Sequence, residues 1–210
     1  MIHIQKVTHT ALCEAAHRLA DGEIIVYGCA SNYIMCTNMQ AESSVKRMFE
    51  LKGRDYRQPL PIILDPGDAH CYASMTAWQQ EVITQLMPGP ISFIVPARNI
   101  PAYVNGGLET VSLVWQENWM MRRLYELFGI HTGTSANLHG QPPPTRVEEA
   151  VASFGDAISM YIDSGPARYG IPNTVIDLTK TPIVMLREGP VSLSQVLKLI
   201  AERVKLPATA

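Results

Sequence analysis

The chain has 210 residues, of which 47% are hydrophobic and 17% are charged. Disordered chains are poorer in apolar side chains, so we expect a single folded domain with one sizeable core, covering residues 1–210. The formal net charge of −2 gives no overall attraction to nucleic acid or acidic membranes, so any site for a polyanion has to be local.

The cysteines and histidines lack the spacings of common metal sites. Cys13, Cys29, Cys36 and Cys71 form no C-x-x-C pair, and the six histidines form no H-E-x-x-H motif. We therefore expect no protein-bound metal, and reduced thiols in a cytoplasmic protein. No apolar run approaches the roughly 18 residues of a membrane-spanning helix, and the N-terminus lacks a signal segment, so no membrane anchor is expected.

The first elements alternate between strand and helix patterns. Residues 2–7 alternate apolar and polar side chains as a strand does, residues 10–19 have helical spacing, and residues 23–27 form a short apolar run typical of a buried strand. The small polar segment 28–33 follows this strand, where ligands often bind in open α/β sheets. A tight connection without a ligand is an equally good interpretation.

A basic segment follows the next predicted helix, residues 41–51. Between positions 46 and 57 two acidic residues accompany five basic ones: Lys46, Arg47, Lys52, Arg54 and Arg57. Lys46 and Arg47 fit a solvated helix face. The other three fall in a predicted loop ahead of a strand at residues 60–64, where ammonium and guanidinium groups can bind phosphate oxygens.

Strands and helices keep alternating to the end of the chain. Further helices are predicted at residues 78–87, 118–128, 147–154 and 193–204, and further strands at 91–95, 110–115, 158–162, 173–178 and 183–186, with a loop at 100–107. This interleaving predicts the α/β class with an open, twisted sheet that is mixed or parallel.

The segment 133–140 is predicted to be a loop that places polar groups. Ser135 offers a hydroxyl and Asn137 an amide, while Gly133 and Gly140 allow backbone N–H groups to approach a ligand closely. Such a loop suits a phosphate or a carboxylate. A simple connecting turn is the alternative, and composition alone favours it.

Five motifs occur in order along most of the chain. They are Lys52-x-Arg54 with Pro59-Leu60, Met87-Pro88-Gly89-Pro90, Thr134-Ser135-Ala136-Asn137-x-x-Gly140, Pro172-x-Thr174-Val175-Ile176-Asp177-Leu178 and Leu186-Arg187-x-Gly189. This succession resembles the YrdC-like family, whose best-known members are threonylcarbamoyl-AMP synthases. The resemblance implies an open α/β fold around a basic concave cavity. It also implies an enzyme that joins ATP, carried with Mg²⁺, bicarbonate and L-threonine into threonylcarbamoyl-adenylate for tRNA modification.

The resemblance also implies roles for single residues. By position, the phosphate-binding side chains are Lys52, Arg54 and Arg187. Gln58 stands where the family has a basic residue, and the adjacent Arg57 is expected to take its place. Thr134, Ser135 and Asn137 match positions that bind the nucleotide phosphate and the substrate, and Thr174 matches the nucleotide edge of the cavity.

Adenylation needs no covalent nucleophile from the protein, because positioning and charge neutralisation suffice. The resemblance implies that the residues acting in this way are Lys52, Arg54, Ser135 and Asn137.

The chain departs from the family pattern mainly on the amino-acid side. Residues 28–35 replace a Pro-Thr-x-Thr-x-Tyr-Gly-Leu segment that lines the threonine pocket, and only Ser31 and Tyr33 keep its chemistry. These two are the predicted substrate-binding residues. Elsewhere, Val114 stands where the family has an arginine, and Asn173 and His139 stand where it has serines. The positions that bind phosphate in the family are better retained than those that bind the amino acid. The acceptor can therefore be L-threonine or a related compound.

Two functions are compatible with these sequence features. The first is synthesis of a carbamoyl-type adenylate, which requires ATP turnover that depends on bicarbonate and an amino acid. The second is a family member without synthesis that binds nucleotide or RNA, either tRNA or double-stranded RNA, through Lys52, Arg54 and Arg57. Salt-sensitive binding without pyrophosphate release would identify the second function.

Overall fold

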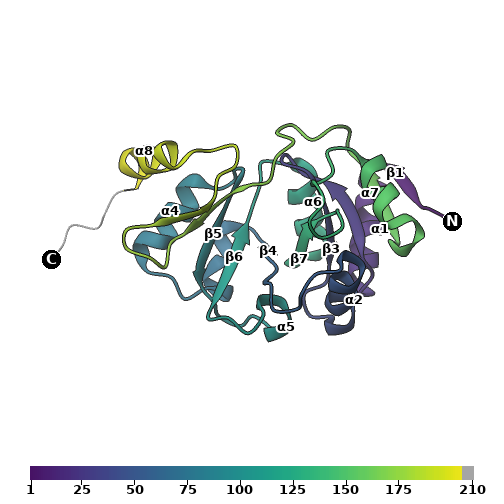
Figure 1. Ribbon diagram of the computed structural model, residues 1–210, viewed down its shortest axis with the longest axis horizontal. Helices are drawn as coiled ribbons and strands as arrows, with labels where there is room; N and C mark the ends of the chain where they lie inside the picture. Colours follow the sequence, from purple (N-terminus) through teal and green to yellow (C-terminus); the bar gives the residue numbers. More distant parts are fainter. Residues whose placement is uncertain (205–210) are drawn as a thin grey trace.

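The computed structural model describes residues 1–204, and this part of the chain contains one mixed sheet of ten strands (Figure 1). The strands are β1 (Ile4–Lys6), β2 (Ile25–Gly28), β3 (Tyr33–Thr37), β4 (Ile62–Ile63), β5 (Ile91–Pro96), β6 (Thr110–Val114), β7 (His131–Ser135), β8 (Met160–Asp163), β9 (Thr174–Asp177) and β10 (Val184–Arg187). Their order across the sheet is β1-β8-β2-β3-β7-β4-β6-β5-β9-β10. Parallel pairs such as β1 with β8 occur beside antiparallel pairs such as β3 with β7, which confirms the predicted α/β class with a mixed sheet.

Helices pack around this sheet. They are α1 (His9–Ala20), α2 (Glu42–Lys52), α3 (Ala69–Tyr72), α4 (Ala77–Leu86), α5 (Ala102–Asn105), α6 (Trp119–Phe128), α7 (Val147–Phe154) and α8 (Leu193–Arg203), with short 3-10 turns η1 (Pro66–Asp68) and η2 (Gly155–Ala157). Helix α1 contacts α6, and α4 contacts α8. Figure 1 shows α8 and β1 at opposite ends of the long axis, so the middle strands lie near the centre of the molecule.

Helix boundaries follow from capping chemistry. At the start of α6 the Asn118 side chain accepts hydrogen bonds from the amides of Met120 and Met121, and Gly129 ends the helix, as the sequence predicts. Helix α2 ends at Gly53, whose φ of 62° lies in the left-handed region that favours glycine. Local sequence chemistry therefore fixes these helix ends.

The core consists of apolar side chains from both the sheet and the helices. Its largest fully buried members include Tyr27, Tyr33, Phe49, Phe93 and Tyr161. Burial of such aromatic side chains contributes roughly 1.5–3 kcal/mol each relative to exposure. The same core therefore stabilises β2, β3, β5, β8 and α2.

Two strands and two short helices, α3 and α5, were not predicted. Residues 133–135 belong to β7, where a loop was expected, and residues 33–37 form β3. Strand β7 pairs with β3 on one side and β4 on the other, so pairing with neighbours outweighs its turn-like composition. A Cβ added at Gly133 would lie 2.6 Å from the Cys36 sulfur, so the glycine serves close strand packing. The predicted loop 100–107 contains the short helix α5.

Three further features concern residues 1–204 only. None of their helices has both the length and the hydropathy needed to cross a membrane. No group of three or more histidine, cysteine, aspartate or glutamate side chains there is arranged to hold a metal ion. The four cysteines are free of disulfide bonds.

Candidate functional site

A cavity of about 310 Å³ lies over the part of the sheet that runs from β3 to the edge strand β10. Its wall contains a row of register partners, in which Arg187 pairs with Val175, Val175 with Ser92, Ser92 with Val114 and Val114 with Ile63. All five residues line the cavity. Since paired positions present their side chains on the same face of a sheet, strands β10, β9, β5, β6 and β4 build this wall together.

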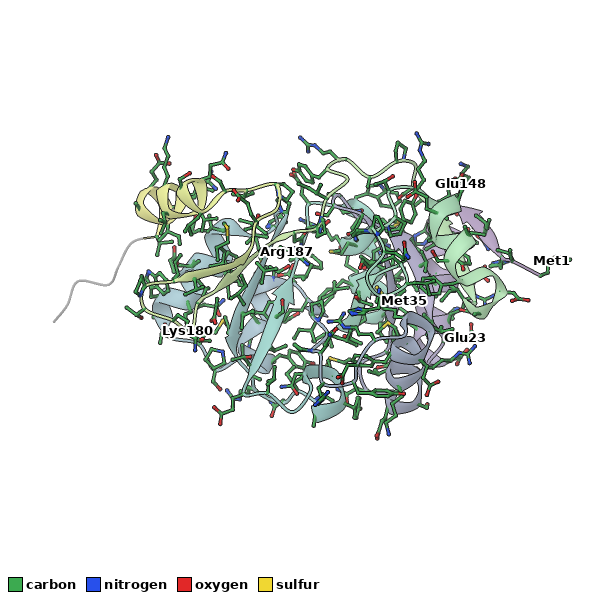
Figure 2. All side chains as sticks on the ribbon, viewed as in Figure 1. Met1, Glu23, Met35, Glu148, Lys180 and Arg187 are labelled. Atoms are coloured by element: carbon green, nitrogen blue, oxygen red, sulfur yellow. The ribbon has the colours of Figure 1, made fainter. Side chains whose placement is uncertain are left out.

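Two arginines bring positive charge to the cavity. Arg54 Nη1 donates to the Thr134 hydroxyl at 3.1 Å and Nη2 donates to the Pro59 carbonyl oxygen at 2.9 Å. Its Nε is buried and has no hydrogen-bond partner. Arg187, labelled in Figure 2 near the middle of the molecule, donates from Nε to the Asn173 carbonyl oxygen at 2.9 Å. Arg54 is thus held in place, and each of its two terminal nitrogens keeps one further N–H that can donate to a ligand.

The electrostatics of the cavity favour an anion. Within residues 1–204 no aspartate or glutamate lines it, whereas Arg54 and Arg187 both do. Burial, with a smaller effect of the nearby Arg187 charge, lowers the pKa of Arg54, and burial lowers the pKa of Arg187. Both guanidinium groups remain charged at neutral pH, so a phosphate that enters would relieve their desolvation and mutual repulsion.

Hydroxyl groups of β7 accompany these arginines. Thr134 and Ser135 both line the cavity. The Thr134 hydroxyl accepts from Arg54, while the Ser135 hydroxyl has no hydrogen-bond partner in the part of the chain that the structure describes. Ser135 pairs with Ile34 of β3, another lining residue. The hydroxyls predicted to bind phosphate therefore lie together with Arg54 and Arg187.

Lys52 and Asn137 lie beside this site, and neither lines the cavity. Lys52 is the last residue of α2 and is 4% exposed, so its predicted place in a loop was wrong. Its Nζ donates to the carbonyl oxygens of Ser135 at 2.5 Å and Asn137 at 2.6 Å. The Asn137 amide donates to the Gln141 carbonyl oxygen at 2.6 Å. Both side chains hold the loop after β7, because their donors are directed at its backbone.

Arg57 and Thr174 also lie outside the cavity lining. The Arg57 guanidinium is exposed and forms an ion pair with Asp55, with Nη2 and Oδ2 2.6 Å apart. Thr174 is fully buried, and its hydroxyl donates to the Val191 carbonyl oxygen at 2.6 Å and accepts from the Gly189 amide at 3.1 Å. Thr174 therefore holds the segment that follows Arg187, while the position of Arg57 gives no support to phosphate binding in the cavity.

The two predicted substrate-binding residues are buried behind the lining. The Ser31 hydroxyl donates to Asn173 Oδ1 at 2.5 Å and accepts from Gln116 Nε2 at 3.2 Å. The Tyr33 hydroxyl donates to the Gly165 carbonyl oxygen at 2.7 Å. Because both hydroxyls already have protein partners, their arrangement indicates structural roles.

Sequence reasoning missed Gln116 and Asn32, which do line the cavity. Gln116 Oε1 accepts from the Ala30 amide at 2.8 Å, and its Nε2 donates to Asn173 Oδ1 at 2.6 Å. A signal for Gln116 was present, since it is a polar residue directly after a predicted strand. Asn32 belongs to the small polar segment that was singled out, although it was not chosen there.

These features define the class of protein: an α/β protein whose sheet carries a cavity lined by arginines, hydroxyls and amides. Residues 17–189 match the family described as "Telomere recombination", which groups Sua5, YciO and YrdC proteins. The chain belongs to this family.

The chain is similar to relatives named threonylcarbamoyl-AMP synthase. It is 32% identical to the Pyrococcus abyssi protein over 90% of this chain, and 28% identical to the Bacillus subtilis protein over 88% of this chain. It spans 56% and 55% of the lengths of these two relatives. The solved structure of P. abyssi Sua5 complexed with L-threonine superposes with a TM-score of 0.88 at 29% identity, covering 97% of this chain and 61% of that one.

Proposed function

We propose that this protein is a threonylcarbamoyl-AMP synthase that uses ATP, bicarbonate and L-threonine or a related amino acid. The observation that supports this best is that Arg54 and Arg187 both line a cavity that no carboxylate lines within residues 1–204. Such a site suits the triphosphate of ATP. The names of the relatives, and the L-threonine bound to P. abyssi Sua5, support the acceptor.

The proposed reaction relies on positioning and charge. The amine of the acceptor and bicarbonate give a carbamate with loss of water, and a carbamate oxygen then attacks the α-phosphorus of ATP. The bond to the β-phosphate breaks and pyrophosphate leaves. Arg54 and Arg187 would neutralise charge on the phosphates, and the Thr134 and Ser135 hydroxyls would orient them. Mg²⁺ would enter with ATP, held by phosphate oxygens.

Lys52, Asn137 and Thr174 have indirect roles in this proposal. Lys52 and Asn137 keep the end of β7 in place, so that Ser135 faces the cavity. Thr174 holds the segment after Arg187 through the Gly189 amide. Their substitution should therefore affect the site through its geometry.

The product is proposed to serve tRNA modification, with no RNA contact required for synthesis. The alternative of RNA binding through Lys52, Arg54 and Arg57 finds little support in their placement. Lys52 is buried, Arg54 faces the cavity and Arg57 is paired with Asp55, so these three side chains form no common surface.

Mass spectrometry of the products tests this function. The protein is incubated with ATP, Mg²⁺, bicarbonate and L-threonine, and then without each component in turn. We expect threonylcarbamoyl-adenylate and an equal amount of pyrophosphate, both dependent on bicarbonate and threonine. Arg54→Ala should lose most of this activity, whereas Arg57→Ala should keep it. ATP binding without adduct or pyrophosphate from any amino acid would contradict the proposal.

A further inference from the structure

The Arg187 side chain is held in the cavity by a single hydrogen bond. Arg187 lies on β10, an edge strand that pairs only with β9 within residues 1–204. Its Nε donates to the Asn173 carbonyl oxygen at 2.9 Å, and its side chain makes no other hydrogen bond in this part of the chain. Ordering a long arginine side chain costs conformational entropy. The direction of the guanidinium therefore depends on where the Asn173 carbonyl lies.

The Asn173 side chain is fixed by a buried network of amides and hydroxyls. The residue is 7% exposed. Its Oδ1 accepts from Gln116 Nε2 at 2.6 Å and from the Ser31 hydroxyl at 2.5 Å, and its Nδ2 donates to the Ser92 hydroxyl at 3.2 Å. A buried network whose members all have partners holds them in one arrangement. Asn173 stands where the family has a serine, so this amide network differs from the family pattern.

Gln116 contributes both donors of its amide to the protein itself. The residue is 5% exposed and lines the cavity. Its Nε2 donates to Asn173 Oδ1 and, at 3.2 Å, to the Ser31 hydroxyl, while its Oε1 accepts from the Ala30 amide at 2.8 Å. A side-chain amide has only two N–H groups. Gln116 therefore has no donor left for a phosphate, and any effect on such a ligand has to pass through its neighbours.

We propose that Gln116 is a positioning residue, which directs Arg187 at the phosphates of ATP by way of Asn173. This inference rests on the proposed function and adds a residue to its site. Gln116 fixes the Asn173 side chain, and the Asn173 carbonyl fixes Arg187 Nε, so that both terminal guanidinium nitrogens are left for phosphate oxygens. The Thr174 amide anchors the same peptide unit to the Pro90 carbonyl oxygen at 3.0 Å. Loss of Gln116 should therefore shift Arg187 without releasing it.

A double-mutant cycle on ATP affinity, measured by titration calorimetry, tests this assignment. Gln116→Met removes the amide and keeps a similar length and volume. We expect it to weaken ATP binding by about fivefold in the wild-type protein, but by less than about twofold in an Arg187→Ala background. The second effect is smaller because a positioning residue has no influence once the guanidinium is gone. Arg54 remains in that background, so binding stays measurable. Equal losses in the two backgrounds would overturn the proposal.

Gln79 offers a matched control, because its amide is bonded in the same way at a different place. It is 7% exposed, its Oε1 accepts from the Thr76 amide at 2.9 Å, and its Nε2 donates to the Leu178 carbonyl oxygen at 2.8 Å. It does not line the cavity. Gln79→Met should lower the melting temperature, as Gln116→Met does, and leave the ATP affinity within about twofold. A loss of affinity equal to that of Gln116→Met would attribute the effect to general destabilisation.

Asn173→Ala breaks the same link one step closer to the guanidinium. It should weaken ATP binding at least as much as Gln116→Met, and its effect should likewise shrink in the Arg187→Ala background. This second cycle decides the question if Gln116→Met does not fold. Additive effects of Asn173→Ala and Arg187→Ala would reject the link.

ATP affinity and adduct formation are measured on the same variants, so failure of this inference is distinguishable from failure of the proposed function. Coupling between Gln116 and Arg187 in ATP affinity, without adduct from any amino acid, would support the positioning role and reject synthesis. Adduct formation without coupling would reject the positioning role alone. A wild-type protein that binds no ATP would overturn both.

Discussion

Lys52 Nζ donates a hydrogen bond to the Ser135 carbonyl oxygen at 2.5 Å, across 83 positions of sequence. A second bond of 2.6 Å reaches the Asn137 carbonyl oxygen. The end of α2 therefore fixes the end of β7, and with it the hydroxyl that Ser135 presents to the cavity. Lys52 matters to this site because it holds the backbone.

Lys52→Met is expected to destabilise the protein. The substitution removes the donor for the Ser135 and Asn137 carbonyl oxygens near a buried position, which should cost about 2 kcal/mol or more in the free energy of unfolding. Urea denaturation measures this change. Lys46→Met is the matched control, since Lys46 is exposed on the same helix and forms only a surface pair with Glu42. Equal effects of the two substitutions would exclude the proposed role of Lys52.

Binding of ATP is expected to take up protons near pH 8. Burial, with a contribution from the Arg54 charge, lowers the pKa of Lys52 to about 7, so its amine is largely neutral at that pH. Phosphates that neutralise Arg54 would raise the pKa of Lys52 toward its ordinary value. Affinity should therefore fall as pH rises above about 7, because binding is linked to proton uptake. Calorimetry in buffers with different ionisation enthalpies measures the uptake, and a value of zero at pH 8 would contradict this linkage.

Arg54 and Arg57 are expected to behave differently, although only three positions separate them. Arg54→Ala should weaken ATP binding by at least tenfold, because it removes one of the two arginine cations that line the cavity. Arg57→Ala should leave the affinity within about twofold, since that exposed side chain pairs with Asp55 outside the cavity. Titration calorimetry at one fixed salt concentration compares the variants. Similar losses in both would indicate general attraction of ATP to the basic loop.

The alternation of strands and helices was predictable from hydrophobic period and capping residues, as at Asn118 and Gly129. Strand β7 was missed because its pairing partners, and not its turn-like composition, make it a strand. Strand β3 was missed although Tyr33, Ile34 and Thr37 favour strands, because the small polar residues before them indicated a loop. The reason for the glycine in the motif Leu186-Arg187-x-Gly189 is found only in the folded structure. A Cβ at Gly189 would lie 2.4 Å from both the Pro172 carbonyl oxygen and the Thr174 amide nitrogen, so this motif and the one that begins at Pro172 pack directly together.

The structure brings part of the predicted site together, and the binding roles of these residues stay predictions. Arg54, Ser135 and Arg187 were predicted from motif positions and do line one cavity. The sequence could not reveal that the amine of Lys52 points at backbone oxygens, or that the Ser31 hydroxyl is bonded to Asn173 across 142 positions. Such long-range contacts depend on the order in which the strands pair, which no local pattern encodes.

Protonation of His131 is expected to lower the free energy of unfolding between pH 6.5 and about 4. The side chain is fully buried, its Nδ1 lies 3.0 Å from the Gly129 carbonyl oxygen and its Nε2 lies 3.0 Å from the Tyr27 hydroxyl. A neutral imidazole satisfies both contacts, by donating from Nδ1 and accepting at Nε2. Burial lowers the pKa of His131 to about 4 from its ordinary value of 6.5.

Acidification should destabilise the folded protein through His131. Between pH 6.5 and about 4 the unfolded chain protonates His131 while the folded chain does not, so stability falls as pH falls through this window. The full loss should be ~3 kcal/mol, fully expressed only below about pH 4. Urea denaturation of wild type and His131→Gln at pH 7, 6, 5 and 4.5 separates this contribution from that of the carboxylates. The glutamine variant should be less stable at pH 7 but lose less stability on acidification, whereas parallel pH profiles would show that His131 is protonated in the folded protein as readily as in the unfolded chain.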